Sequence, residues 1–90
     1  MPQKEHMDPI RILVVDDHPM ERMAFSTLLA SEPGFVVQGE VDSGKRAVDF
    51  LQRNPVDVTL LDLRLDKESG LDYIPAVLQS HAHPKILICY

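Results

Sequence analysis

The chain has little of several features that define large classes of protein. Its 90 residues include a single cysteine, Cys89, so no disulfide can form within it, and we expect a reducing, cytoplasmic environment. Cys89 follows an apolar run, which predicts an inert, buried thiol. No apolar run approaches the roughly 20 residues of a membrane-spanning helix, and no signal peptide is expected. These absences argue against membrane proteins and disulfide-rich secreted domains.

Positive charge is also scarce. There are 9 Lys and Arg residues against 14 Asp and Glu, which gives a formal net charge of −5. Surfaces that bind nucleic acid or anionic lipid need clustered Lys and Arg, so we expect this segment to bind neither. The composition, 44% hydrophobic and 26% charged, is typical of one ordinary globular domain.

Short apolar runs alternate with helical patterns along the chain. Residues 1–9 mix polar, charged and proline residues without a period, which predicts a disordered lead-in before a domain at 10–90. Strands are predicted at Ile10–Val15, at Phe35–Val41, in the run from Val56 that ends at Asp62, and at Ile86–Cys89. The resulting βαβαβαβ order predicts an α/β fold with a parallel sheet and helices on both faces.

Three helical segments are expected between the strands. In the first, Met20 and Met23 recur at helical spacing and are predicted to fill the core. In the second, Ser43 is a plausible N-cap. The third follows Gly70 and contains Pro75, which a helix tolerates only in its first turn.

Carboxylates follow two of the predicted strands. Asp16 and Asp17 come directly after the first strand, and Asp62 ends the third. Ligands of open α/β sheets bind at the carboxyl ends of the strands, so we expect Asp62 at the lip of a crevice rather than in the core. Any one of these residues alone could be a helix cap or a solvated turn residue. Three clustered carboxylates repel one another, need a cation and suit Mg²⁺, beside which a carboxylate nucleophile can become an aspartyl phosphate.

These motifs together resemble a known family. The segments that carry the resemblance are Val14-Val15-Asp16-Asp17-His18-Pro19, Ser43-Gly44 with Ala47, Leu60-Leu61-Asp62-Leu63-Arg64-Leu65, and Ser69-Gly70-Leu71. They are similar to the receiver domain of bacterial two-component response regulators, a regulatory module rather than a turnover enzyme. The Asp-Asp-His-Pro opening resembles the subfamily with a helix-turn-helix output domain.

The resemblance implies a fold, a reaction and residue roles. The fold would be a flavodoxin-like, doubly wound parallel sheet with strand order 2-1-3-4. By position, Asp62 matches the residue that accepts a phosphoryl group from a sensor histidine kinase or a small acyl phosphate. Asp17 matches the direct Mg²⁺ ligand, Asp16 a ligand that acts largely through water, and Arg64 the residue whose backbone carbonyl completes the metal shell.

The chain departs from the family pattern at two places. Asp66 stands where the family usually has proline. Tyr90 falls at or next to the family's Ser/Thr position, and the fifth strand with its Lys and the last helices are missing, so we expect a C-terminally truncated receiver. The apolar strand Ile86–Cys89 would then be an exposed edge through which copies self-associate. The alternative is an interaction module with a receiver-like fold that works without phosphorylation.

Other signals are weaker. The stretch from Gly39 to Lys45 matches the start of a P-loop, but Arg46 follows where Ser or Thr should bind Mg²⁺, so nucleotide binding is not expected. His81 and His83 have no Cys or carboxylate at ligand spacing, which favours a solvated loop over a zinc site.

His18 adjoins the acidic pair. It could tune access to the site, but a first-turn helix residue is the plainer interpretation.

Overall fold

The computed structural model describes residues 8–65 and 69–89. The lead-in predicted for 1–9 therefore falls mostly outside the described residues, as do Asp66 and Tyr90. The elements, in chain order, are β1 (Ile10–Val15), α1 (Pro19–Ala30), β2 (Phe35–Val41), α2 (Gly44–Arg53), β3 (Val58–Asp62), the 3₁₀ helix η2 (Gly70–Tyr73), α3 (Ile74–Leu78) and β4 (Lys85–Cys89).

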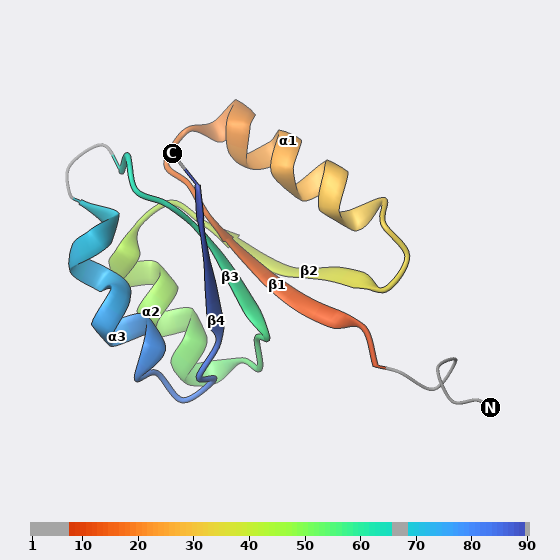
Figure 1. Ribbon diagram of the computed structural model, residues 1–90. Coiled ribbons are helices and arrows are strands. Elements are labelled where there is room, and N and C mark those ends of the chain that lie inside the picture. Colours follow the sequence, from red (N-terminus) through yellow and green to blue (C-terminus); the bar gives the residue numbers. More distant parts are fainter. Residues whose placement is uncertain (1–7, 66–68, 90) are drawn as a thin grey trace.

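The four strands form one parallel sheet in the order β2-β1-β3-β4. Helix α1 covers one face, and α2 with α3 covers the other (Figure 1). This arrangement confirms the predicted flavodoxin-like, doubly wound sheet with strand order 2-1-3-4. Val15 of β1 pairs with Leu61 of β3, so both strands end at the same edge of the sheet.

The main core lies between the sheet and the α2–α3 layer. Leu13, Val15 and Leu61 point from the central strands into it and are fully buried. Ala47 and Leu51 meet them from α2. These three buried residues on adjacent central strands fix the relative position of β1 and β3, and hence of the residues that follow each strand.

Helix α1 packs differently from the prediction. Met20 is 85% exposed and Met23 is 65% exposed, so the prediction that they fill the core is wrong. The helix packs against β1 and β2, buries Ser26, and places Leu29 over the sheet. Two apolar stripes run along α1, and periodicity alone does not reveal which of them meets the sheet.

The ends of the helices agree better with the sequence. The Ser43 hydroxyl accepts a hydrogen bond from the Arg46 backbone N–H at 3.1 Å, which confirms the predicted N-cap. The segment after Gly70 is split into η2 and α3, and Pro75 lies in the first turn of α3, where its missing N–H costs nothing. No helix of the described residues has the length and apolar character required to cross a bilayer.

Strand β4 is an edge of the described sheet and pairs with β3 alone. It begins at Lys85, one residue earlier than predicted, and its Leu87 is 59% exposed. An apolar cavity of about 220 Å³ opens beside it on the α1 side of the sheet. The residues that line this cavity are Ile10, Ile12, Leu29, Phe35, Val58, Leu60 and Leu87.

Candidate functional site

The structure brings the three predicted aspartates together. Asp16 and Asp17 directly follow β1, and Asp62 is the last residue of the neighbouring β3. Ligand-type atoms of Asp16, Asp17, His18 and Asp62 all lie within 4.8 Å of one another. The cluster therefore follows from sheet topology, because parallel strands end at a common edge.

Asp62 lies at the carboxyl end of β3 and outside the apolar core cluster, as expected, but its side chain is shielded from solvent. Asp62 and Asp16 are each 1% exposed, so the acidic pair is buried rather than open at a lip. The side chains of Arg64 and His18, which are about half exposed, contact these carboxylates from the solvent side. A strand pattern specifies where Asp62 lies but not which neighbouring side chains fold over it.

Asp62 is held mainly by Arg64. Its Oδ1 accepts hydrogen bonds from the Arg64 backbone N–H at 2.8 Å and from Nε at 3.1 Å, whereas its Oδ2 lies 3.4 Å from Nη2. Burial raises the pKa of Asp62, but the backbone N–H and the guanidinium of Arg64 lower it by more. Asp62 is therefore a carboxylate, the form required of a nucleophile.

His18 turns into the cluster. Its Nδ1 lies 2.8 Å from Asp16 Oδ1, 3.0 Å from Asp17 Oδ1 and 3.4 Å from Asp62 Oδ2. The hydrogen bond with Asp16, followed by the charges of the other carboxylates, raises the pKa of His18 above its ordinary value. His18 is the N-cap residue of α1, in agreement with the plainer interpretation, and its ring also contacts the acidic cluster.

The cluster has the character of a cation site. Asp16 Oδ2 is buried and has no hydrogen-bond partner among the described residues. Burial, then the neighbouring Glu21 carboxyl, and also the charge of Asp62 raise the pKa of Asp16. A buried carboxylate oxygen without a donor is costly unless a cation meets it. Hard oxygen ligands from two or three carboxylates fit Mg²⁺, so Asp16, Asp17 and Asp62 fit the metal that the resemblance implies.

Gly70 lets the following segment pack against the end of β3. A Cβ atom at this position would lie 2.7 Å from the Asp62 carbonyl oxygen and 2.9 Å from the Leu63 Cα. Both are backbone atoms and cannot move aside, so only glycine fits here. The Gly70 N–H donates a 3.3 Å hydrogen bond to the Leu63 carbonyl, which helps hold the segment beside Asp62.

Sequence reasoning missed two groups at the site. Oε1 of Glu21, in the first turn of α1, accepts a 2.7 Å hydrogen bond from Arg64 Nη2. The second group is the side chain of Arg64, because the resemblance assigns a role only to the backbone carbonyl of this residue. One signal was available: α1 starts at the carboxyl end of β1, so its first turn must lie beside the aspartates.

Two weaker candidates do not form sites. Gly39 lies inside β2, and only two residues separate β2 from α2, so the Gly39–Lys45 match has no phosphate-binding loop. Among the described residues, the side chains that come close enough together to hold a metal ion are those of the Asp16 cluster, and neither His81 nor His83 belongs to it.

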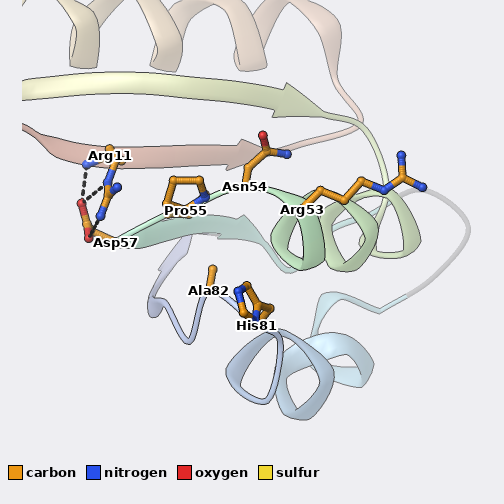
Figure 2. Close-up of a pocket in the computed structure, with 8 residues that line it drawn as sticks. Arg11, Arg53, Asn54, Pro55, Asp57, His81 and Ala82 are labelled. Atoms are coloured by element: carbon orange, nitrogen blue, oxygen red, sulfur yellow. Dashed lines mark hydrogen bonds and ion pairs between the residues drawn. The ribbon is translucent and has the colours of Figure 1, made fainter.

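A polar cavity of about 280 Å³ lies at the opposite end of β3. Figure 2 shows Arg11 and Asp57 locked together there, while the Arg53 side chain extends away from them. Arg11 Nε and Nη2 each lie 3.0 Å from a different Asp57 oxygen. The Arg11 guanidinium lowers the pKa of Asp57, and both Asp57 oxygens accept hydrogen bonds from it. We interpret it as a structural ion pair between β1 and the start of β3.

Comparison with known proteins places the chain. Residues 12–89 match the family described as the response regulator receiver domain. The chain is 38% identical over 80 residues to the nitrate/nitrite response regulator protein NarP of Escherichia coli, which covers 89% of this chain and 37% of NarP. It is 36% identical over 81 residues to a protein-glutamate methylesterase/protein-glutamine glutaminase of Rhodospirillum centenum, covering 90% of this chain and 21% of that protein.

A solved structure agrees with the sequence relatives. The signal receiver domain of the response regulator NarL from Mycobacterium tuberculosis has a TM-score of 0.81 and 29% identity, and the match covers 91% of this chain and 66% of that one. The chain spans well under half the length of NarP and of the methylesterase/glutaminase. What they share with it is the segment that holds the acidic cluster. The chain belongs to the response regulator receiver domain family.

Proposed function

We propose that this receiver accepts a phosphoryl group on Asp62 from a sensor histidine kinase, in a Mg²⁺-dependent reaction of two-component signalling. The observation that carries the proposal is the state of the Asp62 carboxylate. It is buried, its pKa is lowered, Arg64 donates two hydrogen bonds to Oδ1, and Oδ2 lies at the longer distance of 3.4 Å from both Arg64 Nη2 and His18 Nδ1. That second oxygen, Oδ2, is the nucleophile in this proposal.

The transfer is a simple substitution at phosphorus. Asp62 Oδ2 forms a bond to phosphorus while the phosphorus–nitrogen bond of a phosphohistidine, or the phosphorus–oxygen bond of an acyl phosphate, breaks. The electron pair leaves with the donor, and Asp62 becomes an acyl phosphate. Bound Mg²⁺ would offset the carboxylate charges so that an anionic phosphate can approach. In this proposal Asp16, Asp17, Asp62 and the backbone carbonyl of Arg64 hold the ion.

Membership of the receiver family supports a regulatory role. We infer that phosphorylation shifts a two-state equilibrium of the receiver. In this proposal the equilibrium controls a helix-turn-helix output domain, which regulates transcription in the cytoplasm. The net charge of −5 supports the inference that this segment binds neither nucleic acid nor membrane itself.

The experiment is intact-mass analysis after incubation with Mg²⁺ and acetyl phosphate. The parent chain should gain one phosphoryl adduct, and Asp62→Asn should gain none. Asp57→Asn is the matched control, because it makes the same chemical change at the other end of the same strand. An adduct that survives in Asp62→Asn would assign the acceptor to another residue. No adduct on the parent would favour the alternative function.

That alternative is a phosphorylation-independent interaction module, and the exposed edge of β4 favours it. An unprotected apolar strand edge is a template for another strand. We propose that copies of the chain self-associate through residues Ile86–Cys89. Sedimentation velocity should show a concentration-dependent dimer in the parent and a monomer in Leu87→Lys. A parent that stays monomeric at every concentration would contradict self-association.

A further inference from the structure

The Arg64 side chain lies across the solvent side of the acceptor carboxylate. Its Nε is 3.1 Å from Asp62 Oδ1, and its Nη2 is 3.4 Å from Asp62 Oδ2 and 2.7 Å from Glu21 Oε1. Arg64 is 51% exposed, whereas Asp62 is 1% exposed. A cation therefore stands between the buried carboxylate and solvent, on the path by which a phosphoryl group must arrive.

The contacts of Arg64 distinguish the two oxygens of Asp62. Oδ1 accepts both the Arg64 backbone N–H and Nε. Oδ2 has the long contact to Nη2 and a 3.4 Å contact to His18 Nδ1. Arg64 thus leaves Oδ2 as the freer oxygen and places Nη2 beside it. A phosphoryl group on Oδ2 would bring its oxygens next to this nitrogen.

Phosphorylation changes what the guanidinium can bind. A phosphoryl group at neutral pH carries a charge of about −1.5 to −2, compared with −1 on the carboxylate it replaces. Guanidinium groups bind phosphate oxygens in a planar, two-pronged geometry and do so more strongly than they bind neutral acceptors. Nη2 can therefore exchange the carboxylate for phosphoryl oxygens with a small movement of the side chain.

We propose that the Arg64 guanidinium, positioned by Glu21, clamps the phosphoryl group on Asp62 and slows its hydrolysis. This inference rests on the proposed acceptor role of Asp62. In hydrolysis, a water oxygen attacks phosphorus, the bond from phosphorus to Asp62 Oδ2 breaks, and the carboxylate, inorganic phosphate and a proton are released. A guanidinium tethered over the outer face of the group restricts the approach of that water.

Glu21 is a positioning residue in this clamp. It lies in the first turn of α1 and holds Nη2 at 2.7 Å, much closer than Asp62 Oδ2 does. The Glu21 contact does not involve the oxygens that change on phosphorylation, so it can hold the guanidinium over the site before and after transfer. Loss of this contact should loosen the clamp without removing its charge.

The test measures the lifetime of the acyl phosphate. The parent, Arg64→Gln, Arg64→Lys and Glu21→Gln are phosphorylated with Mg²⁺ and acetyl phosphate. They are then desalted into EDTA and followed by intact mass, so the decay is measured without metal or donor. We expect Arg64→Gln to shorten the half-life roughly five- to tenfold. Arg64→Lys, which keeps the charge but not the fork, and Glu21→Gln should give smaller decreases.

Arg46→Gln is the control for charge. Arg46 is 71% exposed and pairs with Asp42 near the start of α2, so its loss changes net charge equally without touching Asp62. Its half-life should equal that of the parent. Thermal melts of all variants distinguish the clamp from a merely structural role. A structural role would lower the melting temperature and leave the decay rate unchanged.

Each outcome decides the clamp separately from the acceptor. No adduct on the parent overturns the proposed function. An adduct on the parent with an equal or longer half-life in Arg64→Gln overturns the clamp and leaves the acceptor role intact. If Arg64→Gln does not fold, Glu21→Gln decides, since a half-life equal to that of the parent in this variant also overturns the clamp.

Discussion

Two aspartates bracket β3, and each is bound by an arginine. Asp57 precedes the strand and accepts the Arg11 backbone N–H at 2.8 Å and Nε at 3.0 Å on one oxygen. Asp62 ends the strand and accepts the same two groups of Arg64 at 2.8 and 3.1 Å. In both, the arginine contributes to a pKa below the ordinary value. As isolated ion pairs, the two ends of β3 are nearly equivalent.

Their surroundings differ. Asp57 is 41% exposed, and its second oxygen receives a 3.0 Å hydrogen bond from Arg11. Asp62 is buried among Asp16, Asp17 and Glu21, and its second oxygen has only long contacts. An arginine–carboxylate pair alone thus indicates a structural ion pair and not a functional site. Crowding of like charge, together with the buried Asp16 Oδ2 that has no hydrogen-bond partner among the described residues, indicates a site.

The largest expected difference between the two ends is in metal binding. Mg²⁺ at ten times its dissociation constant should raise the free energy of unfolding of the parent by about 1.4 kcal/mol, because it binds only the native state. Asp17→Asn should lose most of this increase, and Asp57→Asn should retain it. Thermal melts with Mg²⁺, or with NaCl at matched ionic strength, measure it. Equal increases in the parent and in Asp17→Asn would show that Mg²⁺ does not bind at the Asp62 end of the sheet.

A second difference is in the sign of a mutation's effect on stability without metal. Asp16→Asn should raise the free energy of unfolding by about 1 kcal/mol, because it removes a charge from a crowded, buried carboxylate. Asp57→Asn should lower it, because it weakens a satisfied pair. Urea unfolding in EDTA provides both values. Destabilisation by Asp16→Asn would mean that the cluster is satisfied without a cation.

The smallest expected effect is on pH dependence. Arg11 lowers the pKa of Asp57 in the folded state, so the pair contributes stability above the unfolded pKa of about 3.9 and loses it as pH falls through the lower folded value. Between pH 5 and 2, the parent should therefore lose more stability than Asp57→Asn. Parallel urea titrations of the two proteins test this, and identical slopes would contradict it.

The sequence predicts the strands well because their apolar runs are bounded by polar residues. β1 and β2 have the predicted bounds, and the aspartates lie together because topology requires it. β3 starts at Val58, two residues later than the run suggested. Val56 is buried but precedes the strand pairing of β3. Asp57 is hydrogen-bonded to Arg11, which lies 46 residues away in the sequence. The residues around Asp57 in the sequence do not indicate that Arg11 is its partner.

The chemistry around Asp62 was harder to predict than its position. The burial of Asp62 depends on the directions taken by the Arg64 and His18 side chains, which no strand or helix period specifies. The exposure of Met20 depends on which stripe of α1 meets the sheet. In both cases, side-chain contacts between elements decide the outcome, and such contacts follow from packing rather than from local sequence.

The most direct measurement identifies the modified residue. After phosphorylation, borohydride reduction converts an aspartyl phosphate to homoserine, and trypsin releases a peptide from Asn54 to Arg64 that carries both Asp57 and Asp62. Fragmentation of this peptide compares the two ends of β3 within one molecule. We expect homoserine at position 62 and aspartate at position 57. Homoserine at position 57, or a mark only in peptides that contain neither residue, would contradict it.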